Sequence, residues 1–249
     1  SLVGSVSVYK RQVHDIVQKV MANMQISGSV SGMHGVFKDM NDAINASIEA
    51  QKKVCTMTLD QREQIISLIR KKTHENAEIL ANMGVNETGM GNVGDKILKH
   101  HLTADKVPGT EDISTIAWSG DRGLTLVEMG PFGVIGAITP ATNPSETVIC
   151  NCIGMLAGGN TVVFNPHPNA KKTTIYTINM INEASIEAGG PDNIAVTVEA
   201  PTLDTSAIMM KHPSIHLLVA TGGPGVVTAV LSSGKRAIGA GAGNPPVLV

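Results

Sequence analysis

The chain has 249 residues, 42% of them hydrophobic, and can bury a substantial core as one large or two modest domains. Only 2% of the residues are aromatic, so aliphatic side chains and the twelve methionines must do most of the packing. A formal net charge of −2 offers no electrostatic footprint for nucleic acid or an anionic membrane, and no apolar run approaches the roughly 18 residues of a membrane span. We therefore expect neither partner. Three cysteines give no disulfide framework and favour a reducing, cytoplasmic compartment.

Residues 1–32 are predicted to form an N-terminal segment outside the main domain. After a leader without clear period, apolar residues follow the spacing of a single helical stripe: Val13, Ile16, Val17, Val20, Met21 and Met24. The Ser- and Gly-rich residues 27–32 then predict a flexible linker. From spacing alone, the helix is either a docking element or a helix packed on its own domain.

Residues 33–107 are predicted to be mostly helical from Val36 to about His101, in several pieces. Thr58 and Gln61 have the spacing of a capping box at the start of one helix. Residues 87–91 mark a break before a last short helix over 95–101. On that helix lie Lys96, Lys99, His100 and His101, and adjacent helical residues point about 100° apart, so a solvated face is favoured over a metal or phosphate site.

Residues 113–128 predict a β-hairpin. Two apolar runs, Ile113–Trp118 and Leu124–Glu128, flank a Gly-containing turn of five residues at 119–123. Because this pair of strands precedes the alternating part of the chain, we expect it to leave the main sheet. Projecting strands have unpaired edges and are often used for contact between subunits.

Residues 131–249 alternate between strand and helix patterns, which predicts an α/β fold with a Rossmann-like parallel sheet. The predicted strands are Val134–Ile138, Thr161–Phe164, Ile194–Val198, Ile215–Ala220 and Lys235–Gly239. The predicted helices are Glu146–Ala157, Ala170–Ala188, Leu203–His212 and Val226–Ser233.

The loops after the first two strands carry the first candidates for chemistry: Thr139, Asn143, Asn165 and His167. Ligands of open α/β sheets bind outside the carboxyl ends of the strands. The amide of Asn143 could donate a hydrogen bond to a developing oxyanion, although an Asn-Pro pair on its own also marks an ordinary turn.

The segment 221–225, Thr-Gly-Gly-Pro-Gly, joins an apolar strand to a helix. Glycines let the backbone approach a ligand closely, and a helix N-terminus attracts phosphate. The spacing is not G-x-G-x-x-G, so a tight turn without a ligand remains an equal alternative.

None of the three cysteines stands out as a nucleophile. Cys150 and Cys152 fall on the helix after Asn143 among apolar residues, where buried and unreactive thiols are expected. Cys55 lies close to Lys52 and Lys53, a better environment for a thiolate, but outside the predicted crevice.

Five blocks of sequence resemble the aldehyde dehydrogenase superfamily. They are NETGMGNVGDK at 86–96, GPFGVIGAITPATNP at 130–144, LAGGNTVVFNPHPNAKK at 156–172, ATGGPGVV at 220–227 and IGAGAGNPP at 238–246. More narrowly, the chain is similar to the coenzyme-A-acylating enzymes (acetaldehyde and propionaldehyde dehydrogenases) of bacterial ethanolamine- and propanediol-utilising microcompartments. The resemblance implies an NAD-binding domain over 33–249 of an enzyme that oxidises a short-chain aldehyde and transfers its acyl group to coenzyme A.

The resemblance also implies roles for single residues. Asn143 matches the asparagine of the family's oxyanion hole. Thr139 and Pro140 match the loop beside the nicotinamide, and Thr221, Gly222 and Gly223 match the turn under the pyrophosphate.

Two departures from the family bear on ligand contacts and on the acyl acceptor. His167 and Pro168 stand where many relatives have a lysine that holds the adenosine ribose, so this contact is altered. Residues 239–245 lack the glutamate with which hydrolytic relatives activate water, and a thiol such as coenzyme A becomes the expected acceptor.

A third departure concerns the nucleophile. None of the three cysteines matches the family's nucleophilic cysteine, which is expected beyond Val249 in a missing catalytic domain. We therefore expect this chain to be the nucleotide-binding half of the enzyme and to be inactive alone. Two other readings are a non-catalytic nucleotide-binding or assembly module, and an acyl-phosphate reductase of the same superfamily.

The resemblance extends to the N-terminal helix. Residues 13–26 resemble the tag by which such enzymes enter a microcompartment, which implies a shell protein as partner and a location inside a microcompartment.

The predicted hairpin at 113–128 makes a homo-oligomer the expected state of the protein.

Overall fold

The computed structural model describes residues 15, 32–241, 243 and 247–248. The amphipathic stripe of residues 13–24 and most of its linker therefore lie outside the described residues. Within the described part, no helix combines the length and the apolarity needed to cross a membrane.

The main sheet has six strands, all paired in parallel, in the order β1-β6-β5-β4-β7-β8. The strands are β1 (Val36–Phe37), β4 (Val134–Thr139), β5 (Thr161–Pro166), β6 (Ala195–Val198), β7 (Ile215–Thr221) and β8 (Arg236–Ala240). The predicted Rossmann-like sheet is therefore confirmed, and its strands alternate with helices as expected.

Strand β1 corrects the prediction that the chain is helical from Val36. Val36 pairs with Thr197 of β6, and the turn before it needs glycine, because Gly35 has a φ of 75°. A Cβ at Gly35 would lie 2.4 Å from the carbonyl oxygen of Ala195. The helix begins only at Met40, where the Asp39 side chain caps it.

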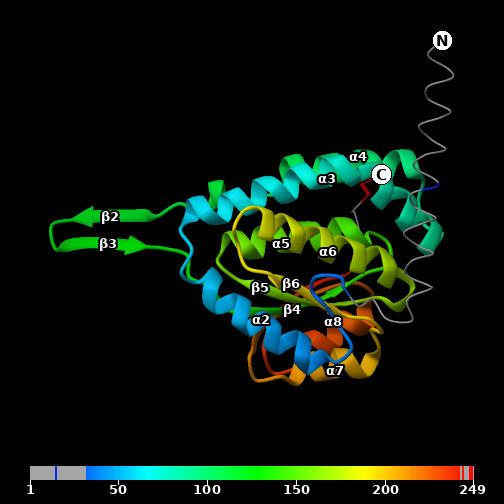
Figure 1. Ribbon diagram of the computed structural model, residues 1–249. Helices are drawn as coiled ribbons and strands as arrows, with labels where there is room; N and C mark the ends of the chain where they lie inside the picture. Colours follow the sequence, from blue (N-terminus) through cyan, green and yellow to red (C-terminus); the bar gives the residue numbers. More distant parts are fainter. Residues whose placement is uncertain (1–14, 16–31, 242, 244–246, 249) are drawn as a thin grey trace, which may run out of the picture.

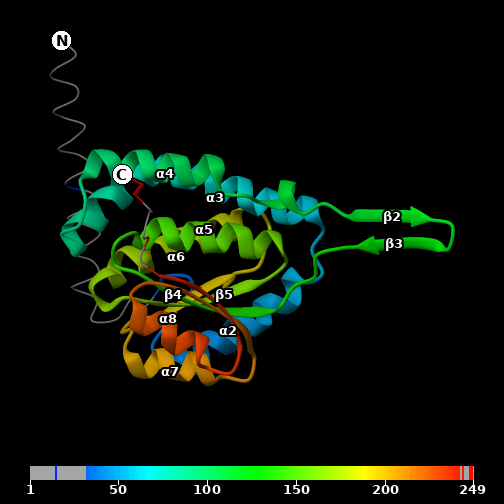
Figure 2. The same ribbon diagram turned by 180° about the vertical axis from the view of Figure 1, so that it is seen from behind.

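Helices cover both faces of the sheet (Figures 1 and 2). One face carries α5 (Pro144–Ala157) and α6 (Lys171–Glu187), with α3 (Leu59–Thr88) and α4 (Val93–Lys106) packed outside them. The other face carries α2 (Met40–Val54), α7 (Leu203–Lys211) and α8 (Pro224–Leu231). Short 3-10 turns, η1 (Thr110–Asp112) and η2 (Pro168–Ala170), connect these elements.

Helix α4 is longer than the sequence predicts, whereas α3 ends at the predicted break. The capping box of Thr58 and Gln61 is confirmed, and α3 runs for 30 residues to Gly89, which ends it with a φ of 68° within the break predicted at 87–91. Helix α4 extends from Val93 to Lys106 because it packs along α3 and over α5.

The prediction of a solvated face at residues 96–101 is wrong. Lys96 is 3% exposed and His100 is fully buried, while Lys99 is exposed and His101 is half-buried. Residues four apart share a helix face, and this face of α4 meets α5 instead of solvent.

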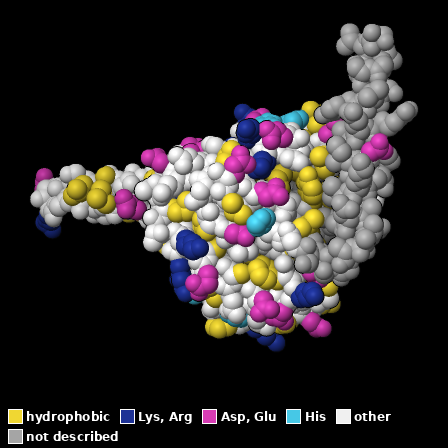
Figure 3. Space-filling model, in the orientation of Figure 1, with side chains coloured by type: hydrophobic (Ala, Val, Ile, Leu, Met, Phe, Trp, Pro, Cys, Tyr) yellow, Lys and Arg dark blue, Asp and Glu magenta, His cyan; other side chains and the backbone are white. Residues whose placement is uncertain are grey.

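The predicted hairpin is confirmed as a separate antiparallel pair that projects from the body of the molecule (Figure 1). Its strands are β2 (Ile116–Gly120) and β3 (Gly123–Val127). The first is shorter than predicted because it begins after η1, and the second keeps its predicted length with a shift of one residue. The turn holds two residues, Asp121 and Arg122, instead of five. Every residue of both strands is exposed, and Figure 3 shows hydrophobic side chains on this projection.

Candidate functional site

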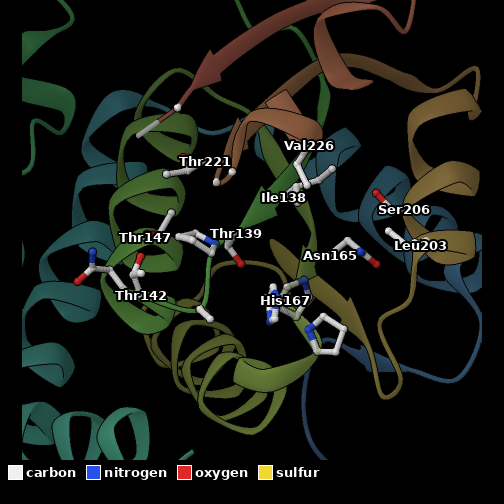
Figure 4. Close-up of a pocket in the computed structure, with 18 of the residues that line it drawn as sticks. Ile138, Thr139, Thr142, Thr147, Asn165, His167, Leu203, Ser206, Thr221 and Val226 are labelled. Atoms are coloured by element: carbon white, nitrogen blue, oxygen red, sulfur yellow. The ribbon is translucent and has the colours of Figure 1, made fainter. Parts of the chain in front are cut away.

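A pocket of about 640 Å³ lies at the carboxyl ends of β4, β5 and β7 (Figure 4). The chain runs from β4 through β5 to β6 in one direction and then returns to place β7 on the other side of β4. A parallel sheet leaves a crevice at such a reversal of strand order, because the loops on either side diverge. The position of the pocket therefore follows from the order of the strands.

All nine candidate residues from the sequence line this pocket. From β4 and its loop come Thr139, Pro140 and Asn143, from the end of β5 Asn165, His167 and Pro168, and from the end of β7 Thr221, Gly222 and Gly223. The structure thus brings together side chains from three strand ends, as expected. Their individual roles stay predictions.

Thr139 provides the clearest sign that the pocket accommodates a ligand. It is the last residue of β4 and only 1% exposed, yet within the described part of the chain its Oγ1 has no hydrogen-bond partner. A buried hydroxyl without a partner costs about 1–3 kcal/mol. Figure 4 shows Thr139 near the centre of the pocket wall, where a bound molecule could supply the missing partner.

The turn from β7 into α8 leaves backbone open to the pocket. Gly223 caps α8 without a side-chain hydrogen bond, and Pro224 at the first helical position has no N–H to satisfy. A Cβ added to Gly222 or Gly223 would meet no atom within 4 Å, so packing within the protein does not require these glycines. They leave space beside a helix N-terminus, which suits an anionic group.

The end of β5 is fixed by hydrogen bonds. The Thr205 hydroxyl donates to Asn165 Oδ1 at 2.7 Å, and Asn165 Nδ2 donates to the carbonyl of Thr202 at 3.3 Å. Asn165 therefore anchors the start of α7 while it lines the pocket. The His167 N–H donates to the carbonyl of Thr139 at 3.0 Å, and the His167 side chain is exposed.

Asn143 lies at the N-terminus of α5 and is partly exposed. Its side chain makes no capping hydrogen bond to the helix, unlike most asparagines at this position. Its Oδ1 instead accepts from Lys99 Nζ at 3.4 Å.

The three cysteines lie outside the pocket lining. Cys152 is buried, which raises the pKa of its thiol to about 12, and burial also raises the pKa of the half-buried Cys150. The expectation of unreactive thiols on α5 agrees with this setting, although Cys150 is less buried than predicted. Cys55 is exposed just after α2.

Sequence reasoning misses two parts of the site. The first is the wall formed by Thr202, Leu203 and Ser206 at the start of α7. Its signal was the three-residue spacing of Thr202 and Thr205, which form a capping box. The second is a buried pair of Lys96 and Glu146 behind the Asn143 loop, whose nitrogen and oxygen lie 3.2 Å apart. It is formed by tertiary contact between α4 and α5.

Comparison with known proteins agrees with this geometry. Residues 21–248 match the model of the aldehyde dehydrogenase family. The chain is 46% identical to the acetaldehyde dehydrogenase (acetylating) of Bilophila wadsworthia, over 96% of this chain and 51% of the relative.

Solved structures show the same relation. The propionaldehyde dehydrogenase from the Clostridium phytofermentans fucose utilisation bacterial microcompartment is 74% identical, with a TM-score of 0.84 over 86% of this chain and 49% of that one. The Rhodopseudomonas palustris propionaldehyde dehydrogenase with bound propionyl-CoA is 48% identical, with a TM-score of 0.84 over 88% of this chain and 50% of that one. The chain thus spans about half the length of these relatives. With its sheet, its pocket and a family match over nearly its whole length, the chain belongs to the aldehyde dehydrogenase family.

Proposed function

We propose that the whole protein oxidises a short-chain aldehyde with NAD and transfers the acyl group to coenzyme A. An aldehyde, coenzyme A and NAD⁺ are converted into acyl-coenzyme A, NADH and a proton. Residues 33–249 are proposed to form the nucleotide-binding domain of this enzyme. The observation that carries the proposal is the pocket at the switch point of the sheet, which all nine candidate residues line.

The pocket suits a dinucleotide in three respects. The turn at Thr221–Gly223 leaves space for the pyrophosphate beside the N-terminus of α8, although the Gly222 N–H already donates to the carbonyl of Ala240. The unpartnered hydroxyl of Thr139 offers a hydrogen bond deep in the pocket. His167 and Pro168, at the exposed rim after β5, are proposed to make the altered contact to the adenosine ribose. NAD, when bound, supplies the acceptor for the hydride.

The residues of the Asn143 loop are proposed to act on the aldehyde. An amide at this position can donate to the oxygen that becomes negatively charged when a thiolate attacks the carbonyl carbon. Residues 239–245 contain no carboxylate that could activate water, which supports a thiol acceptor. Because the three cysteines lie outside the pocket lining, we propose that the nucleophilic cysteine belongs to a part of the protein beyond these residues.

Nucleotide binding by the 249-residue chain tests the first half of the proposal. We expect NADH to bind, with a gain in its fluorescence, and Thr139→Val to weaken binding about fivefold, because one hydrogen bond is worth about 1 kcal/mol. Thr174→Val is the matched control: its Oγ1 is also buried without a partner, but it lies on α6 and not in the pocket lining. Equal affinities of the two variants would count against the assignment of the pocket.

The catalytic half of the proposal predicts that the isolated chain does not turn over. Hydride transfer requires the tetrahedral adduct of aldehyde and thiolate, and the three cysteines are not positioned to form it. Mixing the chain with propionaldehyde, NAD and coenzyme A should give no absorbance of NADH. Formation of NADH above the background without enzyme would contradict this part of the proposal.

Self-association is proposed to use the projecting hairpin. Trp118, Leu124 and Leu126 are 57%, 64% and 60% exposed on strands that pair only with each other in the described structure. Leu124→Lys with Leu126→Lys should lower the mass measured by sedimentation. The surface change Lys71→Glu, which lies on α3, is the control and should leave the mass unaltered.

We also propose that residues 13–26 dock on a shell protein of a bacterial microcompartment in the cytoplasm. The support is the apolar stripe of the sequence and the microcompartment origin of the Clostridium phytofermentans relative. A short amphipathic helix is marginal in water and orders when its stripe is buried in a groove. In cells that make shells, residues 13–26 fused to a fluorescent protein should give puncta, which Ile16→Glu with Val20→Glu should disperse. Diffuse fluorescence of the unaltered fusion would favour packing of the helix on its own domain.

A further inference from the structure

A buried polar cluster lies between α4 and α5, directly behind the loop that carries Asn143. Its members are Lys96 and His100 on α4 and Ser145 and Glu146 on α5, and they are 3%, 0%, 1% and 6% exposed. Lysine and glutamate are rarely buried to this degree unless they are paired. None of the four residues lines the pocket, so they do not contact its contents directly.

Lys96 connects this cluster to the loop. Its Nζ donates to the carbonyl oxygen of Thr142 at 2.9 Å and to Glu146 Oε1 at 3.2 Å. Thr142 precedes Asn143 and lines the pocket, where it is visible in Figure 4. The ammonium group therefore fixes the peptide that joins the two residues.

The rest of the cluster holds Lys96 in place. A backbone carbonyl only accepts, so the 2.7 Å contact between His100 Nδ1 and the Lys96 carbonyl places a proton on Nδ1. Burial lowers the pKa of His100, which leaves its Nε2 as an acceptor for the Ser145 hydroxyl at 2.7 Å. The Ser145 hydroxyl, which also lies 3.2 Å from Glu146 Oε2, has only one proton and gives it to the nearer His100, so Lys96 remains the charged donor to this carboxylate.

Stability alone does not explain such a pair. Transfer of two charges out of water costs several kcal/mol each, and well-packed apolar residues in their place are often as stable or more stable. A role in geometry accounts for the pair better, because its nitrogen also binds the loop carbonyl.

A second lysine of α4 sets the orientation of the Asn143 amide. Lys99, one turn along, donates to Asn143 Oδ1 at 3.4 Å. An ammonium group can only donate, so this contact turns the amide oxygen towards α4 and leaves the Nδ2 amino group to donate to another acceptor. To stabilise an oxyanion, the amide must present a hydrogen-bond donor to it, and the Nδ2 amino group is the donor that stays available.

We propose that Lys96 and Lys99 are positioning residues that act through Asn143. Lys96, locked by Glu146, fixes the backbone of the loop, and Lys99 fixes which end of the amide faces the pocket. The meaning of this orientation for catalysis rests on the proposed function, since the group that would receive the hydrogen bond is the oxygen of the aldehyde substrate. The orientation itself is a property of this chain without any ligand.

Nuclear magnetic resonance of the 249-residue chain labelled with ¹⁵N-asparagine tests the proposal. Asn143→Ser identifies the side-chain amide signals of Asn143 by their loss. Lys99→Met removes the ammonium group from an exposed site, so it should shift these signals and leave the melting temperature unchanged. Lys96→Met should shift them further and lower the melting temperature, because it leaves Glu146 buried without its partner.

Lys72→Met is the matched control. It breaks a Lys–Glu pair of similar length, 2.9 Å to Glu187, between α3 and α6 and away from the loop. The Asn143 signals should not move in this variant, and Asn82, which donates to a carbonyl within α3, serves as the internal reference in all variants.

The proposal is overturned if the Asn143 signals stay in place in Lys99→Met, or if they move as far in Lys72→Met. Lys99→Met decides the matter alone if Lys96→Met does not fold. Because no nucleotide is added, this result is independent of whether the chain binds NADH, and the two proposals can fail separately.

Discussion

Two parts of the main sheet differ in how they are covered. The inner part is formed by β4, β5 and β6, and the outer part by β7, β8 and the helix α8. All six residues of β5 and all four of β6 are buried, since helices pack on both of their faces. In β8 four of the five residues are exposed, and Ile238 is 58% exposed. In α8, which covers one face of β8, Leu231 is 55% exposed. The inner part is buried on both faces, whereas the outer part exposes apolar side chains at its edge.

The pocket joins these two regions. Thr139 and Asn165 belong to the buried inner part, while Thr221, Gly222 and Gly223 belong to the outer part. We infer that the inner part provides a rigid floor and that the outer part gains stability when its apolar edge is covered. An apolar edge of this kind is prone to association.

The largest expected difference between buried and exposed positions is in thiol reactivity. Burial raises the pKa of Cys152 from its ordinary value of 9.0 to about 12, so the thiolate fraction falls about 10³-fold. At pH 8 iodoacetamide should modify the exposed Cys55 first and Cys152 only after the core opens. Mass spectrometry of the alkylated peptides gives both rates. Equal rates in the native chain would mean that the inner part is not a closed core.

The next largest effect is expected from a truncation within the core. Phe164 of β5 is fully buried, and Phe164→Ala should lower the free energy of unfolding by about 3–5 kcal/mol, through lost burial and a cavity. Phe132 is the matched control, because it is 41% exposed and contacts Arg236 at 5.6 Å from its ring centre. Phe132→Ala should cost about 1 kcal/mol or less. Urea unfolding compares the two, and similar losses would remove the distinction between the regions.

The inner strands could be predicted because their apolar runs are long and end in turn residues. β1 could not, since two residues carry no periodicity and its place at the sheet edge depends on Gly35 and on contact with β6. The hairpin can be predicted from its two apolar runs. Its tight turn at Asp121 and Arg122 cannot, because the flanking glycines also read as turn residues.

The pocket residues could be predicted because strand ends and glycine turns are visible in the sequence and because the family blocks fall on them. The supporting cluster could not. Lys96 and His100 look like a solvated pair on an amphipathic helix until α5 brings Glu146 and Ser145 against them. Burial of a charged residue depends on its partner, which lies 50 residues away in the chain for Lys96 and Glu146.

The smallest expected effect on stability concerns Ile238 at the outer edge. Ile238→Thr keeps a β-branched side chain in β8 and removes apolar surface that is already largely exposed, so the free energy of unfolding should change by about 0.5 kcal/mol or less. The same substitution at Ile135 of β4, which is 2% exposed, should cost about 1–3 kcal/mol, because it buries a hydroxyl. Light scattering at rising protein concentration should show weaker association for Ile238→Thr than for the unaltered chain. Ile135→Thr should not weaken association. If Ile238→Thr instead destabilises the chain as much as Ile135→Thr while association stays the same, the edge is part of the core, and the contrast between the two regions does not hold.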